Sequence, residues 1–145
     1  MCIRDSRNTD YKFDLEKFTN VNGKTGVYVQ YANVRAQKLI NDSSTEVSNL
    51  SIMSGELDKY DKSLLRSFIK FEFYFEQTIK NNEPHHLADY LYEISQKFNG
   101  MYQGINILEN ENTVLKENKL KITDLFLQYS NLLMECLGIL PVEKM

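Results

Sequence analysis

The sequence is dominated by apolar residues at helical spacing, which recur with few interruptions from residue 25 to residue 137. The clearest stretch advances in steps of four and three residues through Leu87, Leu91, Ile94, Phe98 and Met101. These steps place the five side chains on one face of a helix, which must be buried against other helices. Only two prolines and six glycines occur among the 145 residues, so long helices can run unbroken. The length suits one domain with one hydrophobic core.

Four helices are predicted, over residues 27–40, 56–80, 84–104 and 113–137. Thr25 or Gly26 is expected to cap the first helix. Pro84 suits the first position of the third helix, where its missing N–H is not needed. Gly138 and Pro141 follow the fourth helix in the order typical of a helix end. Long helices with short connections predict an all-α fold, an antiparallel bundle of about four long helices.

The same spacing predicts which side chains face the core. One face of the first helix carries Tyr28, Tyr31, Ala32, Arg35 and Leu39. The second helix is expected to bury Leu57, Tyr60, Leu64, Phe68, Phe71, Phe73, Tyr74, Phe75 and Ile79. The fourth helix is expected to bury Leu115, Ile122, Leu125, Tyr129, Leu132 and Cys136.

Composition limits the classes of function. The net charge is -3, with 17 basic and 20 acidic residues, which argues against a protein that wraps DNA or RNA electrostatically. A small patch that reads a few exposed bases stays compatible with this charge. No apolar run reaches the length of a membrane span, and the two cysteines show neither metal-ligand nor disulfide spacing. We therefore expect a cytoplasmic protein with no membrane and no DNA partner.

The tripeptide Gly23-Lys24-Thr25 suggests the end of a phosphate-binding P-loop, but the spacing excludes it. The motif needs a glycine five positions before Gly23, and Phe18 stands there. The preceding residues 13–17 carry three charges, which is wrong for the buried parallel strand that leads into such a loop.

The first residues, Met1-Cys2-Ile3-Arg4-Asp5, match the translation of a transposase-end adapter used in sequencing libraries. We expect residues 1–6 to be an artefact of this origin. The competing interpretation is an ordinary polar tail, and in either case the segment is too short and too charged for a signal peptide.

Four motifs resemble, in order, the C-terminal anticodon-binding domain of arginyl-tRNA synthetases. The first motif comprises Gly23, Thr25, Gly26, Tyr28, Gln30, Tyr31, Ala32 and Arg35, from the family pattern G-x-T-G-x-Y-x-Q-Y-A-x-x-R. The others are residues 10–14, residues 84–92 with Phe98, Asn99 and Tyr102, and the end of the chain, 137–145. The resemblance covers nearly all residues from Arg7 onward. One departure is Val27, where the family often has proline.

The resemblance implies a part of an enzyme that joins arginine to its tRNA with ATP and magnesium. The catalytic signatures of the HIGH and KMSKS types do not occur in the sequence. We therefore expect an N-terminally truncated, catalytically inactive fragment with no cofactor of its own. Residues 7–24 would be a junction from the missing catalytic domain, and residues 25–145 the anticodon-binding domain. The implied partners are that catalytic domain and the anticodon loop of the tRNA for arginine.

Candidate tRNA-binding residues lie on the first helix. Tyr28, Tyr31 and Arg35 are spaced i, i+3 and i+7, so one helix face can present two rings and a guanidinium, and Ala32 is expected to leave room for a base. Such groups suit unpaired bases, which proteins read by stacking and by bonding their edges. Every arginine tRNA has C in the middle of its anticodon, so one pocket that accepts C is needed.

Further site residues are implied by the resemblance. Tyr102 and the C-terminal Met145 would join the pocket from other sides. The Met145 thioether is a flexible pocket wall, and its terminal carboxylate can accept a hydrogen bond from a base amine. Lys24 would meet a phosphate.

Structural interpretations compete with several of these assignments. The tyrosines of the first helix could be half-buried core residues, and Arg35 could form a surface ion pair. His85 and His86 are not assigned to a metal, because neighbouring residues on a helix are expected to diverge. A solvated helix face is the default for three lysines of the last helix, Lys116, Lys119 and Lys121.

Two other functions compete with the assignment itself. One is a stand-alone helical module that binds tRNA or a protein. The other is the domain of a sister synthetase, against which the first motif argues.

Overall fold

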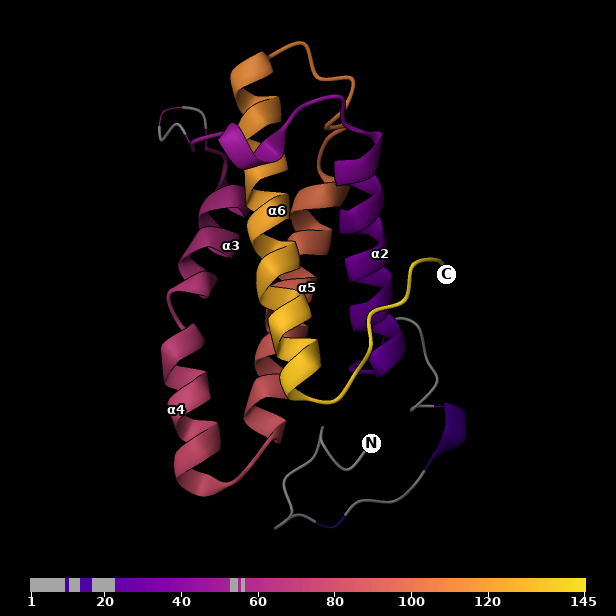
Figure 1. Cartoon of the computed structure of the whole chain (residues 1–145), viewed down its shortest axis with the longest axis vertical. Helices are drawn as coiled ribbons and strands as arrows, with labels where there is room; N and C mark the ends of the chain where they lie inside the picture. The colour runs from indigo at the N-terminus through magenta and orange to yellow at the C-terminus, as the bar shows by residue number, and fades with distance from the viewer. Residues whose placement is uncertain (1–9, 11–13, 17–22, 53–54, 56) are drawn as a thin grey trace.

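The computed structural model describes residues 10, 14–16, 23–52, 55 and 57–145. Within this part of the chain all regular elements are helical, so the all-α prediction is confirmed (Figure 1). The elements are α2 (Gly26–Asp42), the 3₁₀ turn η1 (Val47–Asn49), α3 (Lys59–Phe68), α4 (Phe71–Asn81), α5 (His85–Gln103) and α6 (Thr113–Cys136). None of these helices is long and apolar enough to cross a bilayer. The segment expected to be an artefact, 1–6, and most of the expected junction, 7–24, lie outside the described residues.

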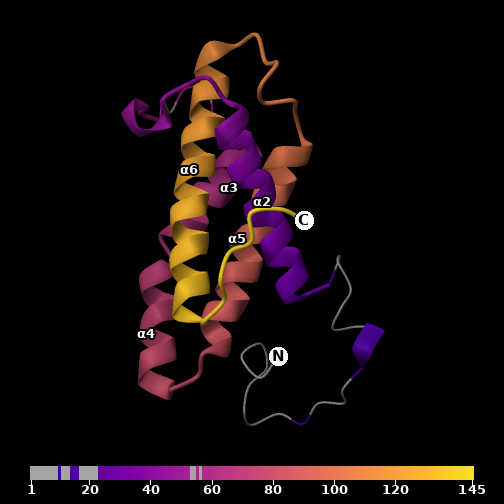
Figure 2. The same ribbon diagram turned by 45° about the vertical axis from the view of Figure 1, so that its right-hand side comes forward.

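Helix α5 is the centre of the bundle. It packs against α2, α3, α4 and α6, and it runs through the middle of the molecule in both views (Figures 1 and 2). The predicted seam is confirmed, since its members are all at most 4% exposed: Leu87, Leu91, Ile94, Phe98 and Met101. Phe98 stacks on Phe126 of α6, with 4.3 Å between the ring centroids.

The predicted helix ends are present. Thr25 is the N-cap of α2, and its hydroxyl accepts a hydrogen bond from the Tyr28 N–H at 3.3 Å. At the end of α6, Gly138 has a φ of +69°, a backbone conformation that favours glycine. The Ile139 N–H donates to the Met134 carbonyl at 2.8 Å, which completes a Schellman turn. This turn sends the last residues of the chain back towards α2 (Figure 1).

The prediction of one helix over residues 56–80 is wrong, because the structure has two helices, α3 and α4, separated at Ile69 and Lys70. In a continuous helix the Ser67 carbonyl would accept from the N–H four residues later. Here it accepts from the Lys70 N–H at 3.0 Å and from the Tyr90 hydroxyl at 3.0 Å. The Ser67 hydroxyl also bonds the Leu64 carbonyl at 2.6 Å, a pattern that bends helices.

This break changes which side chains of α4 are buried. Phe73 and Phe75 are 59% and 37% exposed, so their assignment to the core is wrong. Ile69 and Lys70 separate the two helices, so the inward-facing positions of α4 no longer continue the helical spacing of α3. Tyr74 therefore faces α5 in place of Phe73 and Phe75, and its ring stacks on Tyr90 with the centroids 4.9 Å apart. Its hydroxyl donates to Glu93 at 3.2 Å. Burial and the negative charge of Glu93 raise the pKa of Tyr74, so this hydroxyl stays protonated.

The predicted inner face of α6 is also partly wrong. Leu132 is 44% exposed and Cys136 is exposed, whereas Leu133 and Met134 are fully buried. The buried face of α6 is rotated relative to the predicted one because it includes polar residues. The spacing of the apolar residues does not reveal these four: Asn118, Lys119, Thr123 and Ser130.

Lys119 is the least expected of these residues, because a solvated helix face was predicted for it. Its side chain is 1% exposed, and its ammonium lies 2.8 Å from a carboxylate oxygen of Asp61 and 2.8 Å from one of Asp58. Asp58 also caps α3, since its side chain accepts from the N–H groups of Tyr60 and Asp61. Lys119 therefore joins the second turn of α6 to the start of α3.

Substitution Lys119→Met tests the buried pair. Removing the ammonium leaves Asp61 charged and unpaired in the interior, so we expect the free energy of unfolding to fall by about 3–5 kcal/mol in urea titrations. Lys62→Met, at an exposed position of α3, is the matched control and should change it by at most about 0.5 kcal/mol. Equal effects of the two substitutions would show that the pair is not desolvated.

A second prediction concerns pH. Burial raises the pKa of Asp58, but the hydrogen bonds from Lys119 and from backbone N–H groups outweigh it and lower the pKa below its usual 3.8. The charged form thus stabilises the fold above that value, and this stabilisation is lost as the pH falls through the lowered pKa.

Asp58→Asn keeps a cap acceptor and removes the charge. The difference in urea midpoint between the wild-type chain and Asp58→Asn should therefore shrink from neutral pH to about pH 2.5. A constant difference across this range would contradict the assignment.

Candidate functional site

Arg35 is the centre of a cluster between α2 and α5. Its Nη2 donates to the Tyr31 hydroxyl at 2.7 Å, and its Nη1 donates to Oδ1 of Asn99 at 3.3 Å. The guanidinium carbon lies 4.0 Å from the Tyr31 ring centroid and 5.4 Å from that of Tyr102, within range of cation–π attraction. The structure therefore brings together three of the predicted site residues, Tyr31, Arg35 and Tyr102.

Arg35 meets no carboxylate within the part of the chain that the structure describes. None of the ion pairs there includes Arg35, so the surface ion pair considered from the sequence is not formed with these residues. Its partners are neutral groups and aromatic rings. The side chain is partly exposed, and an anionic ligand at this surface would meet a full positive charge.

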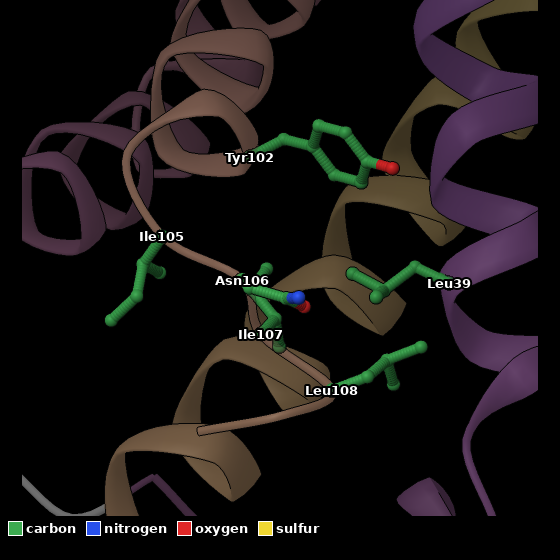
Figure 3. A pocket seen from close by; sticks show the side chains of 6 residues that line it. All are labelled: Leu39, Tyr102, Ile105, Asn106, Ile107 and Leu108. Carbon is green, nitrogen blue, oxygen red and sulfur yellow. The ribbon is translucent and has the colours of Figure 1, made fainter.

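A pocket of about 280 Å³ lies beside Tyr102, between the end of α5, the following loop and α2. Its lining residues are Leu39, Tyr102, Ile105, Asn106, Ile107 and Leu108 (Figure 3). The Tyr102 ring forms one wall, and Leu39 of α2 faces it across the opening. The apolar walls suit a flat ring, and the tyrosine hydroxyl and the Asn106 amide offer polar contacts.

The rotation of α2 about its axis is set by a buried amide. Nδ2 of Asn33 donates to the Ser130 hydroxyl at 2.5 Å and to Oδ1 of Asn131 at 2.8 Å. Asn33 is 3% exposed, so an unpaired amide there would be costly. These bonds to α6 hold the opposite face of α2, with Tyr31 and Arg35, towards α5.

The C-terminal residues run alongside α2 (Figures 1 and 2). Nε2 of Gln30 donates to the Leu140 carbonyl at 2.8 Å, and Oε1 of Gln30 accepts from the Val142 N–H at 3.1 Å. Met145, which the resemblance placed in the site, is 60% exposed at the end of this segment. Sequence reasoning assigned no role to Gln30 or Asn99, although both stand in the quoted motifs.

Two predicted residues of α2 do not join the cluster. Ala32 is fully buried, and the expectation that it leaves room for a base stays a prediction. Its small side chain instead lies in the core of the bundle. The Tyr28 ring packs against Tyr92 of α5, with centroids 5.1 Å apart, and is partly buried against the core. A role for Tyr28 in binding RNA stays a prediction.

Lys24 forms an ion pair with Asp89 of α5. Both side chains are 39% exposed, so the pair is open to solvent and contributes little stability. A phosphate contact by Lys24 stays a prediction.

The expectation that the His85 and His86 side chains diverge is wrong. The two rings do not diverge, since their centroids are 4.1 Å apart, and ligand atoms of Glu83, His85 and His86 lie within 4.8 Å of one another. Glu83 and His86 form an i, i+3 pair at 3.2 Å, which accounts for this grouping. The group stands at the N-terminal end of α5, whose partial positive charge disfavours a cation.

Known proteins share the sequence pattern and the fold of this chain. The family model described as the DALR anticodon binding domain matches residues 29–145. The chain belongs to this family. The arginine–tRNA ligase of Pasteurella multocida is 33% identical over 144 residues, and that of Haemophilus influenzae is 32% identical over 146 residues. Each match covers 99% of this chain and about a quarter of the relative, 26% and 25%.

Solved structures agree with the family assignment. The arginyl-tRNA synthetase of Plasmodium falciparum has a TM-score of 0.83 and 29% identity, over 99% of this chain and 25% of that one. The Thermus thermophilus arginyl-tRNA synthetase, at 23% identity and a TM-score of 0.77, covers 87% of this chain and 22% of its own and shows the same fold. The resemblance to the anticodon-binding domain of arginyl-tRNA synthetases is confirmed.

Arg35→Lys tests the cluster. One ammonium cannot reproduce the planar fork that bonds Tyr31 and Asn99 together. Asn99 is 6% exposed, so its oxygen would lose a donor without gaining water. We expect the free energy of unfolding to fall by about 1–3 kcal/mol, measured by urea titration. Lys38→Arg, at an exposed position of the same helix, should leave the free energy of unfolding unchanged. If Arg35→Lys also leaves it unchanged, the planar fork of the guanidinium is not needed for stability.

Proposed function

We propose that this chain is the anticodon-binding part of an arginine–tRNA ligase and binds the anticodon loop of the tRNA for arginine. The observation that carries the proposal is the Tyr31, Arg35 and Tyr102 cluster beside the pocket. Unpaired bases are recognised by stacking on aromatic rings and guanidinium planes and by bonds to their edges. The Tyr102 ring borders both the positive charge of Arg35 and the pocket, so one base can stack there while its phosphate approaches the cation.

The activity of the whole ligase is part of the same proposal. The chain spans about a quarter of the length of the curated relatives it matches. The joining of arginine to tRNA, with ATP and magnesium, would belong to the remaining length, because this sequence has neither signature of the catalytic half. The role of this chain would be to hold the tRNA and to check its identity.

A protein-binding module is the second candidate, favoured by exposed apolar residues of the α3–α4 region. Ile69, Phe73 and Ile79 are 81%, 59% and 62% exposed. Binding through such a surface would change little with salt. Binding to tRNA phosphates releases counterions, so the affinity would fall steeply between about 50 and about 200 mM salt.

Tyr102→Ala tests the proposal. Loss of one base–aromatic stack should weaken binding of an anticodon stem-loop by about 1–3 kcal/mol. The measurement is a titration of a fluorescently labelled stem-loop at two salt concentrations, with circular dichroism to verify folding. Phe73→Ala is the matched control, because Phe73 is 59% exposed on α4 and does not line the pocket. Unchanged affinity of Tyr102→Ala would remove Tyr102 from the site, and a wild-type chain that binds no stem-loop would refute the function.

A further inference from the structure

We infer that Gln30 is a positioning residue for RNA binding, which holds the C-terminal segment 140–145 against α2 so that this segment forms one side of the site. This inference rests on the proposed function. Its physical basis is the pair of hydrogen bonds from one side-chain amide to Leu140 and Val142, residues that lie 110 and 112 positions further along the chain.

The amide of Gln30 binds the segment as a neighbouring strand would. In an extended chain, the carbonyl of one residue and the N–H two residues later point to the same side. Gln30 donates to the first group, on Leu140, and accepts from the second, on Val142. Both polar ends of the amide are therefore used.

Pro141, between the two bonded residues, favours this arrangement. Proline fixes its own φ and disfavours a helical conformation of the residue before it, so Leu140 is held extended. Proline also has no N–H, so no donor is left unsatisfied on the side that faces away from Gln30. The segment is thus prepared for the amide before it docks, which lowers the entropic cost of ordering it.

Packing does not hold the segment. Leu140, Val142 and Met145 are 85%, 41% and 60% exposed, and the last residue packed against the core is Ile139. In the described part of the chain, the hydrogen bonds of residues 140–145 all go to Gln30. The course of the last residues therefore depends on one side chain of α2.

The length of the segment allows its end to reach the cluster. Met145 is three residues beyond Val142, and three residues span at most roughly 10 Å. Arg35 is five residues beyond Gln30, which is about 7.5 Å along a helix. The segment end lies beside the middle of α2 in both views (Figures 1 and 2). Held by Gln30, the Met145 side chain and the terminal carboxylate can reach a base bound at Arg35 and Tyr102.

The test compares Gln30→Ala with Gln37→Ala in the 145-residue chain, with circular dichroism for folding. Gln37 is exposed on the same helix, and its side-chain amide donates to Asn41, one turn further on. Two quantities are measured, the hydrogen exchange of the Val142 N–H and the affinity for the anticodon stem-loop. Gln30→Ala should abolish the protection of Val142 and weaken binding about tenfold, as expected for one or two lost hydrogen bonds. Gln37→Ala should change neither.

A chain that lacks residues 141–145 separates positioning from a general structural role. If Gln30 acts through the segment, Gln30→Ala should cause no further loss of affinity in the shortened chain. The inference would be overturned if Gln30→Ala lowered the affinity equally in the 145-residue chain and in the shortened chain. It would also be overturned if Gln30→Ala abolished the hydrogen-exchange protection of Val142 and left the affinity unchanged. If the wild-type chain binds no stem-loop, the proposed function fails, while the exchange of Val142 still decides whether Gln30 holds the segment.

Discussion

Helix α5 is enclosed by α2, α3, α4 and α6, and this enclosure is the constraint on which the other features depend. Two of its fully buried residues contact different neighbours: Tyr90 stacks on Tyr74 of α4, and Phe98 stacks on Phe126 of α6. Within this helix only Gln96 and Gln103 are exposed, so its neighbours cover it on nearly all sides. The break between α3 and α4 belongs to the same enclosure, because the Tyr90 hydroxyl takes the Ser67 carbonyl and each short helix then packs on α5 separately.

The candidate site uses the same central helix. Asn99 and Tyr102 stand on the last turn and a half of α5, directly after the fully buried Phe98. Their positions are therefore set by the core and not by a loop, and rigid elements place functional groups more accurately than loops do. Arg35 meets both residues from α2, whose rotation is fixed by the bonds of Asn33 to α6. The site is an edge of the packed core, where the buried Asn99 meets the partly exposed Arg35 and Tyr102.

Polar groups inside the bundle decide details that apolar packing leaves open. Lys119 meets Asp61 and Asp58 at 2.8 Å, so α6 has one favourable position along α3. A buried charge is expensive to leave unpaired, and this cost disfavours other registers more strongly than a misplaced leucine would. The same argument applies to Asn33, whose amide needs Ser130 and Asn131. Such pairs join residues far apart in the sequence, and local patterns do not reveal them.

The sequence by itself determined the helical class, the seam of α5, the helix ends at Thr25 and Gly138, and the family, because spacing and caps are local properties of a chain. It also identified Tyr31, Arg35 and Tyr102, which the structure brings together. Only the tertiary structure decided the break at Ile69, the burial of Ala32 and Lys119, and the docking of the last residues on Gln30. These features depend on which helices meet, since a hydrogen bond to Tyr90, a carboxylate on α3 or an amide on α2 comes from a distant part of the chain.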